Sequence, residues 1–324
     1  MSLLNRILDF VKNWTLPVAI TIGTAAYLLF HLTPSLDAAG DVFYRVFNVV
    51  LPVGLFITLF ISYCKIDFRQ IRIARWHLAV LGAQVLLIGL TTLLALGLEG
   101  SHPQAKLVCE ALLTCFIAPC ATAAPIVTYK IGGDLNSVTT FMLISCLLAS
   151  FAIPALFPLL EPHAHLSFLS TFGTIIYKIS LITVLSMFAA WLVRHAAPMF
   201  HAAVLRQRNL AYYSWSFCLS ITSGITVRNL VGCLSQPHML MVIALLSLAV
   251  CIFQFALGRL IGRRFGMTVT AGQAMFQKNT GLAIWVANMY LSPISTVGAG
   301  SYVVWQNLIN SYELWRSRKD GTDS

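Results

Sequence analysis

A cluster of polar residues in the middle of an apolar segment is the strongest indication of chemistry in this sequence. The segment comprises residues 268–291, and its centre reads Gln277-Lys278-Asn279-Thr280-Gly281. A lysine at the centre of a bilayer costs about 3 kcal/mol on insertion scales. Polar backbone at that depth is tolerated where it is buried in protein or lines a wet cavity. We therefore predict that the helix breaks at Lys278 and Asn279 and forms half of a binding site. A loop between two short interfacial helices is the alternative interpretation.

The composition of the chain is that of an integral membrane protein. It has 324 residues, of which 58% are hydrophobic and only 10% are charged, and its mean hydropathy is +0.81. In a soluble domain about a quarter of the residues are charged. The net charge of +10 does not indicate nucleic acid, because the basic residues lie in short loops between apolar segments. Residues 1–12 show no signal-peptide pattern, and the lack of CxxC and HExxH-type pairs predicts no metal site.

Ten apolar segments are long enough to cross a bilayer as helices, which takes about 20 residues each. They are residues 14–32, 43–64, 76–98, 105–131, 137–160, 171–195, 210–233, 237–261, 268–291 and 295–315. An even number of spans places both termini on the same side. Apart from Lys278, all lysines and arginines fall on one side except Arg45, Lys106, Lys178 and Arg228. This bias predicts that both termini lie in the cytoplasm.

The fourth apolar segment resembles the ninth in having an interrupted centre. Within residues 105–131, Pro119 and Pro125 each remove a backbone donor and clash with the preceding turn. We place this break near 118–125 and that of the ninth segment near 276–281, with a kinked but continuous fourth helix as the alternative. Interrupted helices at matching positions indicate two five-span repeats, residues 1–165 and 166–324, and an odd number of spans gives the repeats opposite orientations. Such breaks point to the midplane site of a secondary transporter.

A broken helix exposes backbone groups that can bind ions. The N-terminus of a half-helix suits an anion, whereas C-terminal carbonyl groups suit a cation. Thr122 follows the first break, and Asn279 and Thr280 follow Lys278 in the second. The breaks contain no nucleophile–base pair and no paired acids, so we do not expect an enzyme. No GxxxxGK[ST] loop is present, so ion or substrate gradients would have to supply the energy.

Several short motifs share the order and spacing of one transporter family. The ninth and tenth spans contain Asn279-Thr280-Gly281-Leu282-Ala283, Ser292-Pro293, Trp305-Gln306-Asn307 and Ser311. The third and fourth contain Gln84 after Arg75-Trp76, then Ala118-Pro119-Cys120, Thr128-Tyr129 and Gly133-Asp134. Together these motifs resemble the bile acid/sodium symporter (BASS) family and its bacterial relatives. The resemblance implies an all-α membrane protein of ten spans in two inverted repeats, with spans four and nine discontinuous and crossing, in a bacterial inner (plasma) membrane.

The same resemblance shows where sodium ligands are missing. Gln84 falls where the family has a sodium-ligand glutamine, but Ala274 and Lys278 stand where it has a glutamate and a glutamine. Ala124 and Pro125 replace a serine-asparagine pair. Bound sodium needs carboxylate or other hard oxygen ligands. Lys278 could supply the positive charge instead, by attracting an anionic substrate or by holding the two breaks together, and a lysine can also gain and lose a proton.

These arguments predict an alternating-access carrier of a small organic anion, bile-acid-like or a smaller carboxylate, embedded in the lipid bilayer. Sodium coupling is expected to be altered or absent, with a proton as the other candidate coupling ion, and no further cofactor or nucleic acid is expected. The alternatives are a sodium-coupled symporter with different ligands and a membrane receptor or enzyme that transports nothing. The expected substrate- and ion-binding residues are Gln84, Pro119, Thr122, Pro125, Gln277, Lys278, Asn279, Thr280 and Asn307.

Some polar residues outside the two breaks have more than one interpretation. Those between Ser220 and Arg228 in the seventh span either line the substrate path or hold helices together. Glu110, near the outer end of the fourth span, is expected to be solvated, with pairing to a basic group as the alternative. Solvated positions in loops are also expected for the histidines His163, His165, His195, His201 and His238.

Overall fold

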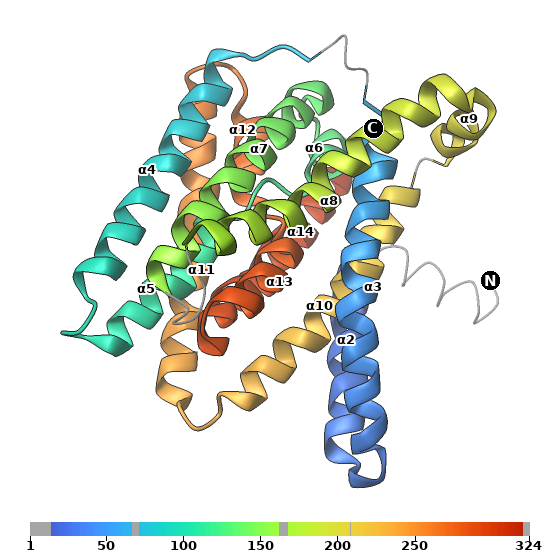
Figure 1. Cartoon of the computed structure of the whole chain (residues 1–324). Helices are drawn as coiled ribbons and strands as arrows, with labels where there is room; N and C mark the ends of the chain where they lie inside the picture. Colours follow the sequence, from blue (N-terminus) through green and yellow to red (C-terminus); the bar gives the residue numbers. More distant parts are fainter. Residues whose placement is uncertain (1–13, 67–70, 162–167, 208, 320–324) are drawn as a thin grey trace.

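The computed structural model describes residues 14–66, 71–161, 168–207 and 209–319, and this part of the chain is almost entirely α-helical (Figure 1). The first helices are α2 (Thr15–Leu32), α3 (Asp37–Cys64), α4 (Arg75–Gly97), α5 (Pro103–Ile117), α6 (Ala124–Lys130) and α7 (Leu135–Leu160). They are followed by α8 (Phe168–Ala196), α9 (Pro198–Arg206), α10 (Leu210–Gly232), α11 (Pro237–Arg263), α12 (Thr268–Phe276), α13 (Thr280–Tyr290) and α14 (Thr296–Lys319). The predicted boundary between the repeats, with His163 and His165, lies outside the described residues.

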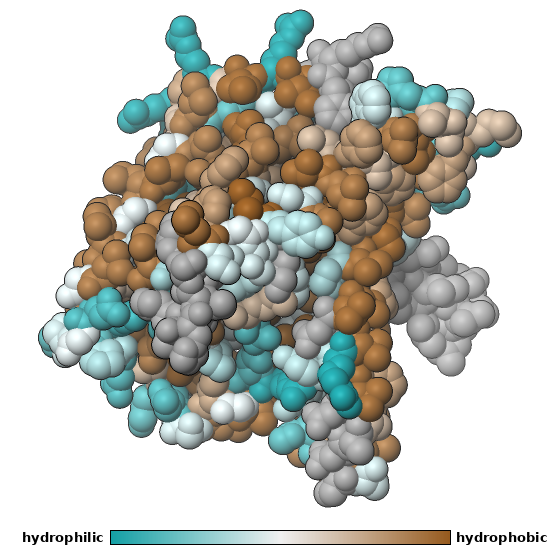
Figure 2. Space-filling view, in the orientation of Figure 1, coloured by the Kyte–Doolittle hydropathy of each residue, from teal (hydrophilic) through white to brown (hydrophobic). Residues whose placement is uncertain are grey.

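Long apolar helices make this a membrane-embedded helical protein. Within the described part of the chain, five helices are long and apolar enough to cross a bilayer: Thr15–Leu32, Val42–Cys64, Arg75–Gly97, Leu135–Leu160 and Pro237–Arg263. α8 and α9 provide a sixth if the 115° bend between them lies within one span. Figure 2 shows hydrophobic surface extending along α4 and α3, with hydrophilic residues gathered at the upper edge and toward the lower end.

The helices form two groups, which Figure 1 shows side by side. α2, α3 and α10 pack against one another, and we call them the α2–α3–α10 bundle. α4 to α7 and α11 to α14 form a larger group, the crossing bundle, in which α11 contacts α12, α14 and α5. α8 packs against both α3 and α7. The two groups therefore share a long boundary, along which α10 faces α13 and α14.

Glycines allow the closest helix contacts in both groups. A Cβ atom at Gly23 would overlap the Ser220 carbonyl oxygen where α2 meets α10, and one at Gly298 would overlap the Ala111 carbonyl oxygen where α14 meets α5. In lipid, association depends on such close backbone approach, because helices gain little from apolar burial there. Gly224, from the polar run on α10, also lies at the α2 contact. This part of the run therefore serves helix packing.

Glu110 is buried, so the expectation that it is solvated was wrong. Its side chain is 0% exposed, Ser295 Oγ donates a hydrogen bond to Oε2 at 2.8 Å, and Lys106 Nζ lies 3.6 Å from Oε1. Lys106 also lies 3.5 Å from Glu99 and 3.6 Å from Glu161. A buried carboxylate needs such partners, because an isolated charge in the interior is very costly. The cluster joins α5 to the end of α7 and to the turn before α14.

His201 is also buried, contrary to the prediction of a solvated loop position. The bend after α8 brings α9 back to the end of α3, where His201 Nε2 lies 2.9 Å from the Cys64 carbonyl oxygen. Arg194 donates to the Ile66 carbonyl oxygen at 2.6 Å. These contacts satisfy carbonyl groups that the end of α3 leaves without intrahelical partners. His195 and His238 are exposed, as expected.

Candidate functional site

Inside the crossing bundle, two pairs of consecutive helices are each separated by a short non-helical segment. Residues 118–123 separate α5 from α6, and residues 277–279 separate α12 from α13. Both segments lie within the predicted intervals and are buried. The first is not a kinked but continuous helix, and the second is not an exposed loop between interfacial helices. Pro119 lies in the first segment and Lys278 at the centre of the second, which are the residue types that favour a break.

The two non-helical segments cross and form a short antiparallel pair. A β-bridge joins Cys120 and Lys278, flanked by hydrogen bonds of 2.8 Å from Ala121 N to Gln277 O and from Asn279 N to Pro119 O. In a membrane interior each unpaired backbone group costs several kcal/mol. Each break thus supplies the backbone partners that the other lacks, and the two half-helix pairs fix each other's position.

A glutamine from α14 completes this arrangement. Gln306 Oε1 accepts a hydrogen bond from Lys278 N at 2.9 Å, and Gln306 Nε2 donates to Lys278 O at 3.1 Å. The side-chain amide therefore pairs with Lys278 as a neighbouring peptide group would. Asn310, one helical turn further, accepts a hydrogen bond from Gln277 Nε2 at 3.0 Å. α14 is consequently a third support of the crossing.

The side chain of Lys278 points to the end of α5. It is 1% exposed, and Nζ donates to the Phe116 carbonyl oxygen at 3.3 Å. Within the described residues it forms no ion pair. The last carbonyls of a helix carry partial negative charge and lack intrahelical donors, so a cation is stabilised there. Gln84 Nε2, on α4, donates to the same Phe116 oxygen at 2.9 Å and to the Ala118 oxygen at 3.3 Å.

A small polar cavity lies on the boundary between the crossing bundle and the α2–α3–α10 bundle. Its volume is about 10 Å³, about the space that one water needs. The crossing bundle contributes Ala121, Thr122, Asn279, Thr280, Gly281 and Val303, and the other bundle contributes Leu55, Trp215, Cys218, Leu219 and Thr222. Lys278 does not line it. In this structure the cavity is therefore too small for an organic substrate.

The N-terminus of α13 faces this cavity. Asn279 caps the helix, since its Oδ1 accepts a hydrogen bond from Leu282 N at 3.2 Å. The first backbone N–H groups of a helix and the positive end of its dipole favour an anion. Thr122, Thr222 and Thr280 line the cavity around this position, and the Thr222 hydroxyl donates to Cys218 O in its own helix at 2.9 Å. The predicted residues Thr122, Asn279 and Thr280 therefore come together, with Thr222 from the polar run on α10 added to them.

The remaining predicted residues divide into two kinds. Pro119 and Gln277 form the crossing through their backbone, and Gln84 shares a carbonyl partner with Lys278. Pro125 is the second residue of α6, where a missing N–H costs nothing, so it starts a helix rather than interrupting one. Asn307 donates to Val303 O in its own helix at 2.6 Å and contacts neither break through a hydrogen bond.

Sequence reasoning missed three supports of the crossing. Gln306 belongs to one of the motifs but is not among the expected site residues. Ser145 on α7 has no distinctive sequence pattern, although its Oγ accepts a hydrogen bond from Cys120 N at 2.9 Å. Asn310 is the third. The spacing of Gln306 and Asn310, four residues apart in an apolar segment, places both on one helix face. That pattern is a usable signal for polar contacts with a buried partner.

Comparison with known proteins adds no relative to this picture. The chain matches no protein-family model and no curated protein. The resemblance to the bile acid/sodium symporter family is therefore carried by the short motifs alone, and any function has to be argued from the crossing and its cavity.

Proposed function

We propose that this protein is a secondary transporter of a small organic anion that works by alternating access. The observation that carries the proposal is the small polar cavity at the boundary between two helix bundles, lined by the crossing on one side and by α3 and α10 on the other. A relative movement of the bundles would open this cavity to one side of the membrane or the other. In alternating access, one bundle rocks against the other, so that the same site is exposed first to one side of the membrane and then to the other.

In this proposal the chain crosses the membrane ten times as two inverted five-span repeats. The α5–α6 and α12–α13 pairs are the fourth spans of the two repeats, which is the position of midplane sites in secondary transporters. The bias of basic residues supports cytoplasmic termini, and the motifs support a divergent bacterial member of the bile acid/sodium symporter family in the inner membrane.

The polarity of the crossing supports an anionic substrate. The backbone N–H groups at the N-terminus of α13 are donors, with Thr122 and Thr280 beside them at the cavity, and a carboxylate accepts from N–H groups of this kind. Lys278 lies outside the cavity at the C-terminal end of α5. Its proposed role is thus a fixed internal cation that holds the two breaks together, rather than a direct ligand of the substrate.

A sodium-coupled symporter with different ligands is the second candidate. The observation in its favour is a set of buried amide oxygens without hydrogen-bond partners, on Gln84, Gln277 and Asn307. Unpartnered amide oxygens are hard ligands of the kind that alkali and alkaline-earth cations take. All three residues are amides, so this set of oxygens contains no carboxylate.

Uptake into proteoliposomes tests the proposal. The purified chain is reconstituted, and uptake of radiolabelled anions is measured, from short keto acids to carboxylated steroids, with sodium, potassium or choline outside and with or without a pH gradient. We expect saturable uptake of at least one anion that does not depend on sodium. Asn279→Ala and Thr122→Val should reduce it more than ten-fold, because each removes a polar group at the cavity.

A matched control separates the cavity from general effects of losing a hydroxyl. Thr91→Val on α4 removes a hydroxyl that bonds only to Leu87 O in its own helix at 2.7 Å, and it should leave uptake unchanged. Strictly sodium-dependent uptake would favour the second candidate. Saturable binding of an anion without net flux would instead identify a receptor and overturn the proposal.

A further inference from the structure

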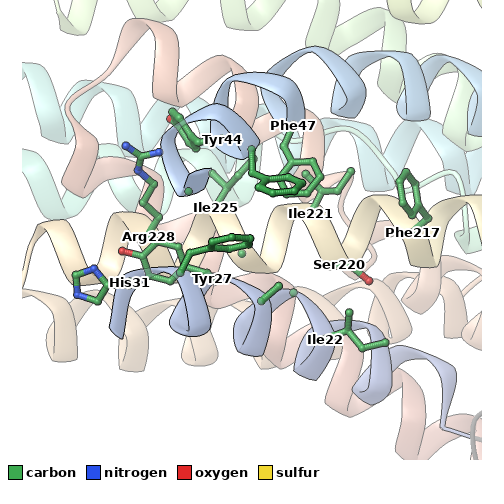
Figure 3. Close-up of a pocket in the computed structure, with 16 residues that line it drawn as sticks. Ile22, Tyr27, His31, Tyr44, Phe47, Phe217, Ser220, Ile221, Ile225 and Arg228 are labelled. Carbon is green, nitrogen blue, oxygen red and sulfur yellow. The ribbon is translucent and has the colours of Figure 1, made fainter. Parts of the chain in front are cut away.

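A large apolar groove lies in the α2–α3–α10 bundle, away from the crossing (Figure 3). Its volume is about 580 Å³, within the range of about 300–1,000 Å³ of small-molecule sites. α2 contributes Ile22, Ala26 and Phe30, and α10 contributes Phe217, Ile221 and Ile225. The groove shares no lining residue with the small cavity at the crossing. It is therefore a separate site.

The groove is polar at one end only. Figure 3 shows Arg228, His31 and the hydroxyl of Tyr27 together at this end, with Ile22 and Phe217 at the opposite end. The Arg228 guanidinium lies over the Tyr44 ring, 3.5 Å from its centre, and the rings of Tyr27 and His31 stack at 5.5 Å. A guanidinium has five N–H donors in a planar fork that matches a carboxylate. It can therefore hold its ring contact and other partners while it binds an anion.

The rest of the groove is mainly apolar and is lined by α2, α3 and α10. From Arg228 to Phe217 the groove follows α10 for 11 residues, which is about 16 Å at 1.5 Å per residue. Phe30, Phe43 and Phe47 form an aromatic wall with ring centres 5.0 and 5.9 Å apart. Ile22 and Phe217 are 57% and 54% exposed, so the far end opens to the surroundings of the helices. In a bilayer those surroundings are acyl chains.

We propose that this groove binds a single-chain amphiphile with a carboxylate head, such as a long-chain fatty acid, which enters from the membrane. The carboxylate lies against Arg228, Tyr27 and His31, and the chain extends along Ile225 and Ile221 toward Phe217. A charged end and a mainly apolar remainder of the groove match one head group and one chain. The proposal does not depend on transport, because the groove and the crossing cavity have different linings.

Calorimetric titration of the full-length chain in neutral phosphatidylcholine nanodiscs, with empty nanodiscs as the blank, tests the proposal. The probes are straight-chain carboxylates from octanoate to tetradecanoate, and dodecanol as an uncharged analogue of dodecanoate. We expect affinity, expressed against the free aqueous concentration of the probe, to rise about four-fold with each methylene, as transfer of one CH₂ out of water implies. The increase should stop when the chain fills the groove. Dodecanol should bind at least ten-fold more weakly than dodecanoate, because it lacks the charge-assisted hydrogen bonds.

Two pairs of variants locate the site. Arg228→Gln should weaken dodecanoate binding about ten-fold and leave dodecanol binding unchanged, whereas Arg45→Gln, an exposed arginine next to Tyr44 that does not line the groove, should change neither. Ala26→Phe fills the groove and should abolish binding of both probes. Ala25→Phe, on the adjacent exposed position outside the groove, is its control. Both alanines are exposed, so these substitutions leave helix packing intact.

Three results would overturn the proposal. The first is equal loss of dodecanoate and dodecanol binding in Arg228→Gln, which would mean that the arginine only supports the fold. The second is unchanged binding in Ala26→Phe, which would place the amphiphile elsewhere. The third is a phospholipid that co-purifies with the chain by native mass spectrometry and is not displaced by carboxylates, which would assign the groove to a structural lipid.

Discussion

Lys278 and Glu110 are two buried ionisable residues whose surroundings differ. Glu110 has a basic partner and a hydroxyl donor, whereas Lys278 has one carbonyl partner and the end of a helix. A lysine ammonium has three donors, so a single carbonyl leaves it incompletely satisfied. An incompletely satisfied buried cation is costly and is usually found where function requires it. The contrast separates a structural charge pair from a charge that we assign to transport.

The role of Lys278 as a fixed internal cation predicts the behaviour of Lys278→Met. Methionine has a similar length and no charge, so the protein should fold but lose most anion uptake in proteoliposomes. Calorimetric titration with sodium, against potassium and choline at constant ionic strength, should show no saturable binding to the native chain. Sodium-selective binding to the native chain, or unchanged uptake and cation dependence in Lys278→Met, would contradict this role.

The Glu110 cluster predicts a difference between two glutamates that contact the same lysine. Glu110→Gln leaves Lys106 with a buried uncharged neighbour and weakens the contact with Ser295, so we expect unfolding to become easier by about 1–3 kcal/mol. Glu99 is half exposed at 51%, and Glu99→Gln should change the stability by less than about 0.5 kcal/mol. Thermal unfolding in detergent measures both. Equal effects of the two substitutions would mean that the burial of Glu110 does not contribute to the stability of the fold.

At the scale of helices, the breaks lie where the residue types predicted them, but the side chains of α14 that bond to the second break were not predicted from the sequence. A proline and a lysine within apolar segments are local signals, and the breaks lie at them. Which side chain of α14 reaches Lys278 depends on helix rotation, because adjacent residues point about 100° apart. Gln306 faces the crossing and Asn307 does not. That helix rotation is set by packing of α14 on α5 and α11, so the sequence alone did not identify Gln306 as the partner of Lys278, and the prediction of Asn307 as an ion- or substrate-binding residue stays a prediction.

This difference in direction gives a direct test on α14. Gln306→Leu removes both hydrogen bonds to the backbone of Lys278 and leaves its buried N–H unpaired, which costs about 1–3 kcal/mol, whereas Lys278 O keeps a hydrogen bond from Thr280 N at 2.8 Å. Asn307→Leu loses one bond to its own helix, and its Oδ1 has no partner already. We expect a clearly lower unfolding temperature for Gln306→Leu than for Asn307→Leu. The reverse order would show that the side-chain amide does not hold the crossing.

At the scale of the whole molecule, the boundary between the bundles decides whether the cavity can open. Contacts within each bundle depend on glycines that let backbones touch, as at Gly23 and Gly298. Across the boundary, the glycines meet side-chain atoms instead: a Cβ atom at Gly281 would lie 3.4 Å from Leu55 and Thr222, and one at Gly300 on α14 would lie 2.6 Å from Thr226 Cγ2 on α10. Sequence patterns revealed the apolar helices but not this division, because it arises from which helix faces meet in three dimensions. Alternating access requires such side-chain contacts at the boundary to exchange while the backbone contacts inside each bundle hold.

A cross-link across this boundary should therefore stop transport. A Cβ atom at Gly281 would lie 3.4 Å from Thr222 Cγ2, so cysteines at these two positions are close enough for a disulfide once Cys218, one turn before Thr222, is replaced by alanine. We expect oxidation of the double variant to abolish anion uptake in proteoliposomes and a reductant to restore it. Uptake by each single-cysteine variant should be the same before and after oxidation. Full uptake by the verified disulfide form would mean that the α2–α3–α10 bundle and the crossing bundle do not move apart, and the alternating-access mechanism would have to be abandoned.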